Sequence, residues 1–287
     1  MKTYYLESLG CAKNLVDSES FAAILERAGY QALETPEGAD LVLVNTCSFL
    51  RDSLHELDLV LAELAELKNS GSCGNLLVTG YVTKRGLEEF QRCYPEVDAW
   101  IPLKDFAALE RYLELPGSGK TERKAITHSY YRYLRISDGC SNHCSYCAIP
   151  SIRGEMQSVP IPELVEEAER LAADSDYPAQ ELIVIAQDTA SYGMDIYGRK
   201  ALPELLEKLH AIPQFQWIRV MYLHPDHFET GWLELWKRLP KLLPSFEIPI
   251  QHSEDGILSS MRRKLGGMEL IHMFHKIRES LPQAVLR

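Results

Sequence analysis

The sequence has no long hydrophobic segment and no excess of positive charge, and its first residues predict no leader. It contains no apolar run of roughly 18 residues, so it predicts no membrane span. The chain passes from Met1 directly into a strand pattern, which leaves no room for a secretory signal peptide. The seven cysteines are an odd number, which favours a reducing cytoplasm over a disulfide framework. With a formal net charge of −11, the segment is not expected to bind nucleic acid; a basic protein partner suits it better, and charge that only aids solubility is the alternative.

The densest group of metal ligands lacks a fourth cysteine. Cys140, Cys144 and Cys147 are spaced CxxxCxxC, and no cysteine follows them. Thiolates suit iron–sulfur clusters or zinc, and a closed structural site takes four ligands. Three ligands on a four-iron cluster leave one iron open to another molecule. The alternative is a zinc site completed by His143 or a distant cysteine, which the spacing disfavours because zinc sites usually pair CxxC units.

Upstream of this group, the apolar pattern predicts repeated β/α units in an open parallel sheet. We expect strands at residues 4–9, 41–44, 76–79 and 99–101, and helices at 21–28, 54–64 and 106–113. Cys11 and Cys47 follow the first two strands, so they are expected at the sheet edge where ligands bind. By spacing alone, two buried structural cysteines are equally expected.

Domain organisation follows from composition. Residues 115–128 contain Pro116, Gly117 and Gly119, and this predicts a linker. We therefore expect an N-terminal α/β domain at residues 1–114 and a second domain at residues 129–287.

The second domain shows a β/α pattern typical of a barrel. Strands are expected at residues 131–136, 182–186, 217–221, 246–250 and 284–287, and helices at 162–171 and 270–281. The sequence stops at the fifth strand, so we expect a partial, truncated barrel. Gln187 and Asp188 follow the second strand, where polar residues of a β/α barrel indicate an active site; capping of the next turn is the alternative. His224 and His252 follow later strands, and for His252 a scaffold role is as well supported as ligand contact.

CxxxCxxC after the first barrel strand resembles the radical S-adenosylmethionine (SAM) superfamily. The resemblance implies a [4Fe-4S] cluster on Cys140, Cys144 and Cys147 whose open iron chelates the amino and carboxylate groups of SAM. It places Tyr146 beside the adenine, and Gln187 and Asp188 are candidates for holding SAM or substrate. Arg263, in the segment Ser260-Met261-Arg262-Arg263, is a weaker candidate for the SAM site.

The N-terminal half resembles the methylthiotransferases of that superfamily, through Ser8-Leu9-Gly10-Cys11-Ala12-Lys13-Asn14-Leu15-Val16-Asp17-Ser18-Glu19 and Asn45-Thr46-Cys47-Ser48-Phe49. In that family, three strand-tip cysteines hold a second [4Fe-4S] cluster that carries the sulfur. Cys11 and Cys47 match two of them, but Tyr81 stands where the third is expected. Cys73 and Cys93 lie too far from the tip to replace it, so we expect this cluster to be weakened, altered or absent.

Together these motifs resemble the group that modifies a small-subunit ribosomal protein. The resemblance implies an enzyme that adds a methylthio group to the β-carbon of an aspartate in that protein, using SAM and a one-electron reductant in the cytoplasm. One alternative is a tRNA adenosine methylthiotransferase, which tends to carry asparagine where Asp188 stands. Another is an iron–sulfur protein without turnover, because the second cluster site is incomplete.

Overall fold

The computed structural model describes residues 1–47, 50–83, 86–117, 122–126, 130–173 and 179–287. The chain divides into two compact units, Met1–Thr127 and His128–Arg287. The division falls inside the predicted linker, of which residues 118–121 and 127–128 lie outside the described part of the chain. Residues 122–126 belong with the N-terminal unit, because the Lys124 amide donates to the Glu19 carbonyl over 3.0 Å. Across the described ranges, no helix is both long and apolar enough to cross a membrane.

The N-terminal unit is built on a five-stranded sheet in the order β2-β1-β3-β4-β5, in which every pairing is parallel. The predicted units are therefore present, and a short strand at the edge, β2, escaped the sequence pattern. The strands are β1 (Lys2–Ser8), β2 (Tyr30–Ala32), β3 (Leu41–Thr46), β4 (Asn75–Gly80) and β5 (Ala99–Trp100). The helices are α1 (Ala12–Arg27), α2 (Arg51–Asn69), α3 (Leu87–Cys93), α4 (Phe106–Tyr112) and the 3-10 turn η1 (Tyr81–Thr83).

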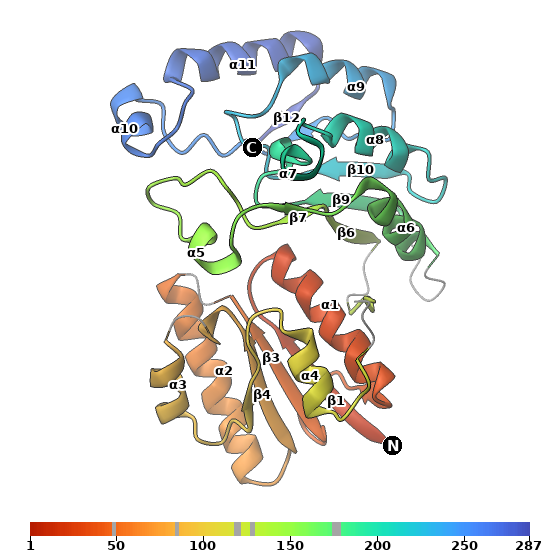
Figure 1. The fold of residues 1–287 in the computed structure, drawn as a ribbon, viewed down its shortest axis with the longest axis vertical. Coiled ribbons are helices and arrows are strands. Elements are labelled where there is room, and N and C mark those ends of the chain that lie inside the picture. Colours follow the sequence, from red (N-terminus) through yellow and green to blue (C-terminus); the bar gives the residue numbers. More distant parts are fainter. Residues whose placement is uncertain (48–49, 84–85, 118–121, 127–129, 174–178) are drawn as a thin grey trace. The chain divides into compact units, whose positions relative to one another are not determined.

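Helices cover both faces of this sheet (Figure 1). Side chains of β3 alternate between two cores, as the pleat of a strand requires. Val42 and Val44 pack with Leu57 and Leu61 of α2, whereas Leu41 and Leu43 pack with α1 and α4. Burial on both faces explains why β3 reads as a continuous apolar run.

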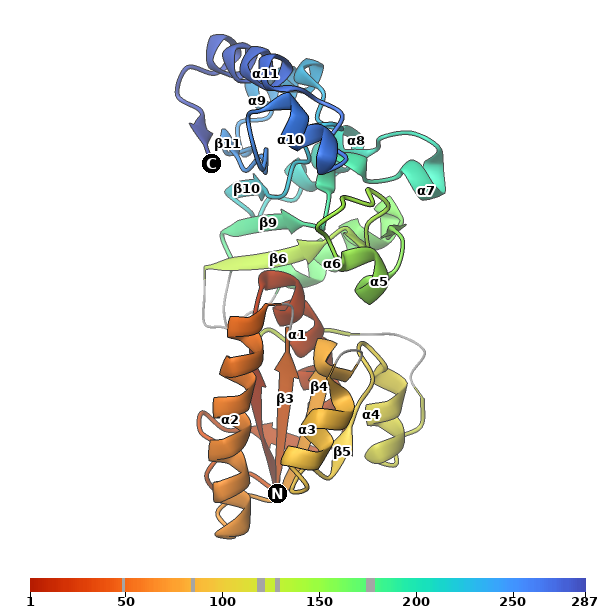
Figure 2. The same ribbon diagram turned by 90° about the vertical axis from the view of Figure 1, so that its left-hand side faces the viewer.

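The C-terminal unit begins a β/α barrel. Its three-stranded parallel sheet has the order β10-β9-β6, as the side-by-side arrows of Figure 2 show. The strand succession continues through β11, which pairs in parallel with β12. The strands are β6 (Tyr131–Arg135), β7 (Ser137–Asp138), β8 (Gln157–Ser158), β9 (Glu181–Ile185), β10 (Trp217–Val220), β11 (Ser245–Phe246) and β12 (Val285–Leu286). The predicted fourth strand, 246–250, was too long, because only its first residue lies in β11.

The helices of this unit include the two that the pattern predicts, at residues 162–171 and 270–281. They are α5 (Ile149–Arg153), α6 (Ile161–Ala172), α7 (Met194–Tyr197), α8 (Leu202–His210), α9 (Leu233–Arg238), α10 (Asp255–Ser260) and α11 (Gly267–Ser280), with 3-10 turns η2 (Thr189–Ser191) and η3 (Thr230–Trp232). One core unites Leu182 and Val184 of β9 with Leu164 of α6 and Leu205 of α8. The carboxyl ends of β6, β9 and β10 therefore meet at one edge, which is where β/α barrels build their sites.

Candidate functional site

The three clustered cysteines lie on a loop that leaves the carboxyl end of β6. A short antiparallel ladder between β7 and β8 closes the base of this loop. Gly139 stands at the loop's entrance with φ of +75°, and a Cβ there would collide with the Glu155 carbonyl, so only glycine fits. At the far end, the Ser145 hydroxyl donates to the Ser260 carbonyl over 2.8 Å. The loop is thus held at both ends before any metal binds.

Cys140, Cys144 and Cys147 are all half-buried free thiols. Burial raises the pKa of the Cys140 thiol to about 11, so a bound metal must supply the charge that stabilises its thiolate. A single tetrahedral zinc would bring thiolates to about 3.8 Å from one another, from its Zn–S bond of about 2.3 Å. Among the described residues, the one group of three potential ligands within 4.8 Å of each other contains no cysteine. The three Sγ atoms thus do not lie within 4.8 Å of one another in this structure, so they are not gathered as a tetrahedral zinc site would hold them.

A cavity of about 400 Å³ opens beside this loop. Its walls come from the cysteine loop and from the segments that follow β9, β10 and α10. The residues that line it are Cys140, Ser141, Asn142, Cys144, Met156, Asp188, Ser191, Met194, Lys200, His224, Asp226, His227, Arg262 and Lys264. Of the three residues predicted to bind cofactor, Asp188 lines this cavity, whereas Tyr146 and Gln187 do not.

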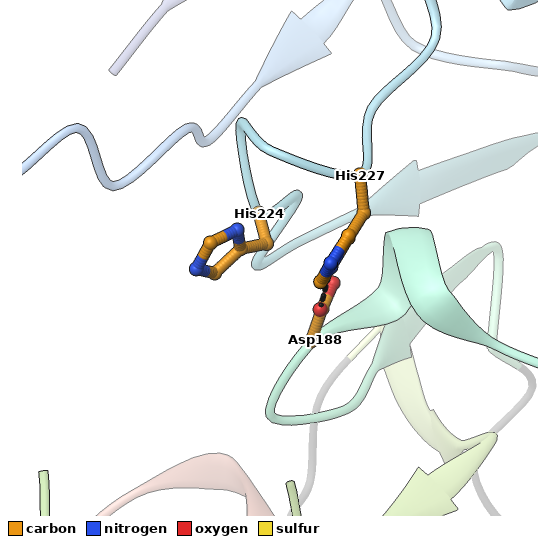
Figure 3. A group of neighbouring side chains, drawn as sticks. All are labelled: Asp188, His224 and His227. Carbon is orange, nitrogen blue, oxygen red and sulfur yellow. Dashed lines mark hydrogen bonds and ion pairs between the residues drawn. The ribbon is translucent and has the colours of Figure 1, made fainter. Parts of the chain in front are cut away.

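Asp188 is the hub of the cavity wall. Its Oδ2 accepts hydrogen bonds from Asn142 Nδ2 at 2.9 Å and Ser191 Oγ at 2.6 Å. It also accepts one from His227 Nδ1 at 2.6 Å, which Figure 3 shows as a dashed line. Its Oδ1 accepts from the amides of Ala190 and Ser191, which caps η2. Burial opposes ionisation, yet the hydrogen bonds from His227, Ser191 and Asn142 lower the pKa of Asp188 to about 2. The carboxylate is charged, and both of its oxygens are occupied by donors from the chain itself.

A second network joins the predicted adenine-side tyrosine to the strand tips. Arg263 is 8% exposed; it donates to Tyr146 Oη over 2.6 Å and also to His224 Nε2. Its guanidinium lies 6.0 Å from the centre of the Tyr146 ring. Because Tyr146 is itself half exposed, its contact with the buried Arg263 helps to fix the orientation of the ring.

Gln187 is directed at the base of the cysteine loop. Its Nε2 donates to Asp138 Oδ1 over 2.8 Å, and Arg153 pairs with the same carboxylate at 3.2 Å. Gln187 Oε1 is buried without a partner among the described residues. Its role in binding cofactor stays a prediction.

His224 makes folding depend on pH. Burial and the neighbouring Arg263 lower its pKa from 6.5 to about 4, so the unfolded chain binds the extra proton between these values. We expect the contribution of His224 to the free energy of unfolding to be fully present above pH 6.5. It should be lost by up to about 3 kcal/mol as the pH falls to 4. Urea denaturation followed by tryptophan fluorescence measures this. His224→Gln should flatten that part of the profile, while the exposed His272→Gln should leave it unchanged; equal slopes in both would contradict the assignment.

The second cysteine pair lies at strand tips of the N-terminal unit, as predicted. Cys11 is the N-cap of α1, just past β1, and Cys47 directly follows β3. A hydrogen bond from the Cys47 thiol lowers the pKa of Cys11 to about 5. Asn14 holds the ends of β1 and β3 together, because its Nδ2 donates to the Leu9 carbonyl at 2.7 Å and to the Asn45 carbonyl at 3.1 Å. These two thiols are neighbours, not separate core residues.

Tyr81 occupies the adjacent tip. β3 and β4 pair with Thr46 opposite Gly80, so Tyr81 stands one residue beyond the ladder beside Cys47. Its side chain is 7% exposed. Cys73 lies before β4 and is buried in the core at the opposite end of that strand, and Cys93 ends α3 on the way back to β5. Neither replaces a third thiol at the tips, as the strand lengths predict.

Gly80 lets these tips come together. It has φ of +101°, and an added Cβ would fall inside contact distance of the Thr46 carbonyl oxygen. We expect Gly80→Ala to lower the free energy of unfolding by about 1–3 kcal/mol more than Gly38→Ala does. Gly38 has φ of +80°, but a Cβ added there would meet no atom within 4 Å. Gly38→Ala therefore measures the cost of the backbone strain without a clash. Urea denaturation of the two variants provides the measurement, and equal losses would argue against the clash.

The sequence pattern did not single out Asn142, Ser191, His227 or Lys264. Asn142, Ser191 and His227 each lie just after or near the carboxyl end of an expected strand, as Asp188 does. That shared position is a usable signal, because side chains at neighbouring strand ends can reach the Asp188 carboxylate. Lys264 carries no such signal, since its place at the cavity depends on how the segment after α10 folds back.

Two family models match the chain. Residues 3–102 match the Uncharacterized protein family UPF0004, and residues 134–286 match the Radical SAM superfamily. The two matches fall in different compact units, one in each.

Curated relatives cover nearly the whole chain. A protein of Lachnoclostridium phytofermentans named ribosomal protein uS12 methylthiotransferase RimO is 39% identical over 100% of this chain and 68% of its own length. Proteins of the same name from Clostridioides difficile and Thermotoga sp. are 37% and 36% identical over 98% of this chain. They are covered over 66% and 67% of their length, so this chain spans about two thirds of these relatives.

Among solved structures, the cobalamin-dependent SAM radical enzyme OxsB matches with a TM-score of 0.65. The match covers 100% of this chain and 49% of OxsB at 10% identity, so it concerns the fold alone.

Proposed function

Because this chain belongs to the radical SAM methylthiotransferase family, we propose that it adds a methylthio group to the β-carbon of an aspartate in small-subunit ribosomal protein uS12. The observation that carries the proposal is the CxxxCxxC loop at the carboxyl end of β6, beside a cavity lined by Asp188 and His227. The partners are this protein and a one-electron reductant, both in the cytoplasm. Neither a membrane nor a nucleic acid is required.

Cys140, Cys144 and Cys147 are the residues that would hold a [4Fe-4S] cluster, because they are three free thiols on one loop and thiolates are the ligands that such clusters take. When bound, the cluster supplies the electron that splits SAM and yields a radical able to take hydrogen from an unactivated carbon. The chain's own residues orient the reactants. Arg263 fixes the ring of Tyr146, and Asp188 fixes Asn142 and His227 at the cavity wall.

The strand tips of the N-terminal unit do not fit a three-cysteine cluster. They offer two thiols, Cys11 and Cys47, and the phenol of Tyr81. A phenol is a harder and weaker ligand for iron–sulfur clusters than the thiolate that it replaces. We therefore propose that a second cluster is weak or absent here, and we assign no reaction step to it.

The test is anaerobic reconstitution of the purified chain with iron and sulfide, followed by addition of SAM, a reductant and uS12. We expect about four iron atoms per chain, cleavage of SAM, and a methylthio mass increase on one aspartate of uS12. A mass increase on tRNA adenosine in place of uS12 would replace the proposal with the tRNA-modifying alternative. SAM cleavage without either product would favour an iron–sulfur protein that lacks methylthiolation, the reading that Tyr81 supports. A colourless chain holding one zinc ion would refute all three.

A further inference from the structure

The carboxylates that line the cavity beside the cysteine loop already accept hydrogen bonds from the chain, whereas one lining ammonium group, that of Lys264, has no such partner among the described residues. Asp188 accepts hydrogen bonds on both oxygens. Asp226 accepts from the Lys264 and Leu265 amides at 3.0 Å and 3.1 Å. The lining cations differ. Lys200 binds Glu229 at 2.8 Å, whereas the Lys264 ammonium has no partner within the described ranges. A ligand entering this cavity therefore meets one cation that is available, the Lys264 ammonium, and carboxylates that already accept hydrogen bonds from the chain.

His227 offers a second open group. Its Nδ1 lies 2.6 Å from Asp188 Oδ2, the contact drawn in Figure 3, and also 2.6 Å from Ser191 Oγ. A ring nitrogen that faces a carboxylate donates to it, so Nε2 is the nitrogen left for a ligand. Nε2 has no partner in the part of the chain that the structure describes, and His227 lines the cavity. A carboxylate behind one ring nitrogen fixes the tautomer and the direction of the other, as it does in many histidine sites.

The two segments that carry these groups are tied together. Asp226 binds the backbone of Lys264, and His224 accepts from Arg263. The loop after β10 and the segment after α10 thus form one wall, which fixes His227 and Lys264 on the same side of the cavity.

Asp188, His224 and His227 place one ligand atom each within 4.8 Å of one another, a set that resembles a metal site. The hydrogen bonds argue against it. A cation would have to displace Asn142, Ser191 and His227 from the Asp188 carboxylate, and it would lie near Arg263, which already occupies His224 Nε2. The arrangement is that of a positioned histidine.

We propose that His227 and Lys264 together recognise a carboxylate, and that this carboxylate belongs to the acceptor aspartate of the protein substrate. The inference rests on the proposed function for the identity of the acceptor. The Lys264 ammonium brings a full charge, and the proposal takes His227 as the imidazolium, which donates from both ring nitrogens, from Nδ1 to Asp188 and from Nε2 to the carboxylate. Hydrogen bonds between charged groups are the strong ones. Recognition of the carboxylate fixes its neighbouring β-carbon in the cavity beside the cysteine loop.

The experiment compares two synthetic peptides, one with the acceptor aspartate of uS12 and one with asparagine there, for binding to the reconstituted chain. The wild type is expected to prefer the aspartate peptide by about 10- to 100-fold, as the loss of a charged hydrogen bond predicts. His227→Gln and Lys264→Ala should each reduce that preference by about tenfold or more. The matched controls His272→Gln and Lys276→Ala, both exposed on α11, should retain it.

Equal binding of the two peptides by the wild type would overturn the inference, and so would full discrimination by both variants. Lys264 is exposed, so its variant tests the site even where His227→Gln perturbs folding. SAM also carries a carboxylate, and its dissociation constant is measured in parallel. It should be unchanged in both variants; weaker SAM binding with intact peptide discrimination would assign the site to SAM and reject the proposal.

The two proposals fail in different ways. Discrimination without any methylthio product would reject the proposed function and leave the carboxylate site standing. Product formation with equal binding of the two peptides would reject the carboxylate site alone.

Discussion

Tyr81→Cys is expected to raise the iron content of the reconstituted chain from about four to about eight atoms. The reason is geometric. Thr46 and Gly80 pair across β3 and β4, so a cysteine at position 81 would lie one strand spacing, about 4.8 Å, from Cys47 along the sheet edge. Cys11 already contacts Cys47 from the other side. A third thiol would complete the ligand set that the tips lack, and iron analysis with absorption spectra measures the gain.

Two further variants give the controls. Tyr81→Phe keeps the ring and removes the hydroxyl, and we expect it to leave the iron content near four. If the Tyr81 phenolate were itself a ligand, the wild type would already carry about eight and Tyr81→Phe would lose iron. Cys73→Ser in the Tyr81→Cys background should keep the gain, because Cys73 lies in the core at the other end of β4. A gain that vanished with Cys73 would show that the sheet rearranges.

The second large effect is expected from Cys144→Ser. Cys144 lies at the centre of the CxxxCxxC loop and lines the cavity. The variant keeps only two of the three thiolates, which are too few to hold a four-iron cluster. We therefore expect bound iron to fall from about four atoms to near zero, and SAM cleavage to fall to background. Iron analysis and detection of the cleaved nucleoside measure the two losses.

Cys93→Ser is the matched control. Cys93 is an exposed cysteine at the end of α3, in the other compact unit. Its loss should change neither iron content nor SAM cleavage. Equal losses from Cys93→Ser and Cys144→Ser would mean that the bound iron does not depend on the loop, and the assignment of Cys140, Cys144 and Cys147 would then be wrong.

The sequence alone determined the element order and the ligand types of this protein. Apolar runs such as Leu41–Val44 and Leu182–Ile185 predict buried parallel strands because both faces of such a strand are covered. Cys11, Cys47, Asp188 and the CxxxCxxC loop all follow predicted strands, so their places at carboxyl ends follow from chain direction alone. The sequence also shows that the third strand tip lacks a thiol, because Tyr81 stands at that position.

The tertiary structure alone decided which side chains remain available to a ligand. The sequence predicts Asp188 as a ligand-binding residue. In the folded chain five hydrogen-bond donors occupy its carboxylate, and His227, one of these donors, is left to face the cavity with its other ring nitrogen. Lys264 reaches the cavity only because the segment after α10 folds back onto Asp226. Periodicity records which face of an element is buried; hydrogen bonds between distant segments depend on the path of loops, which carry no period.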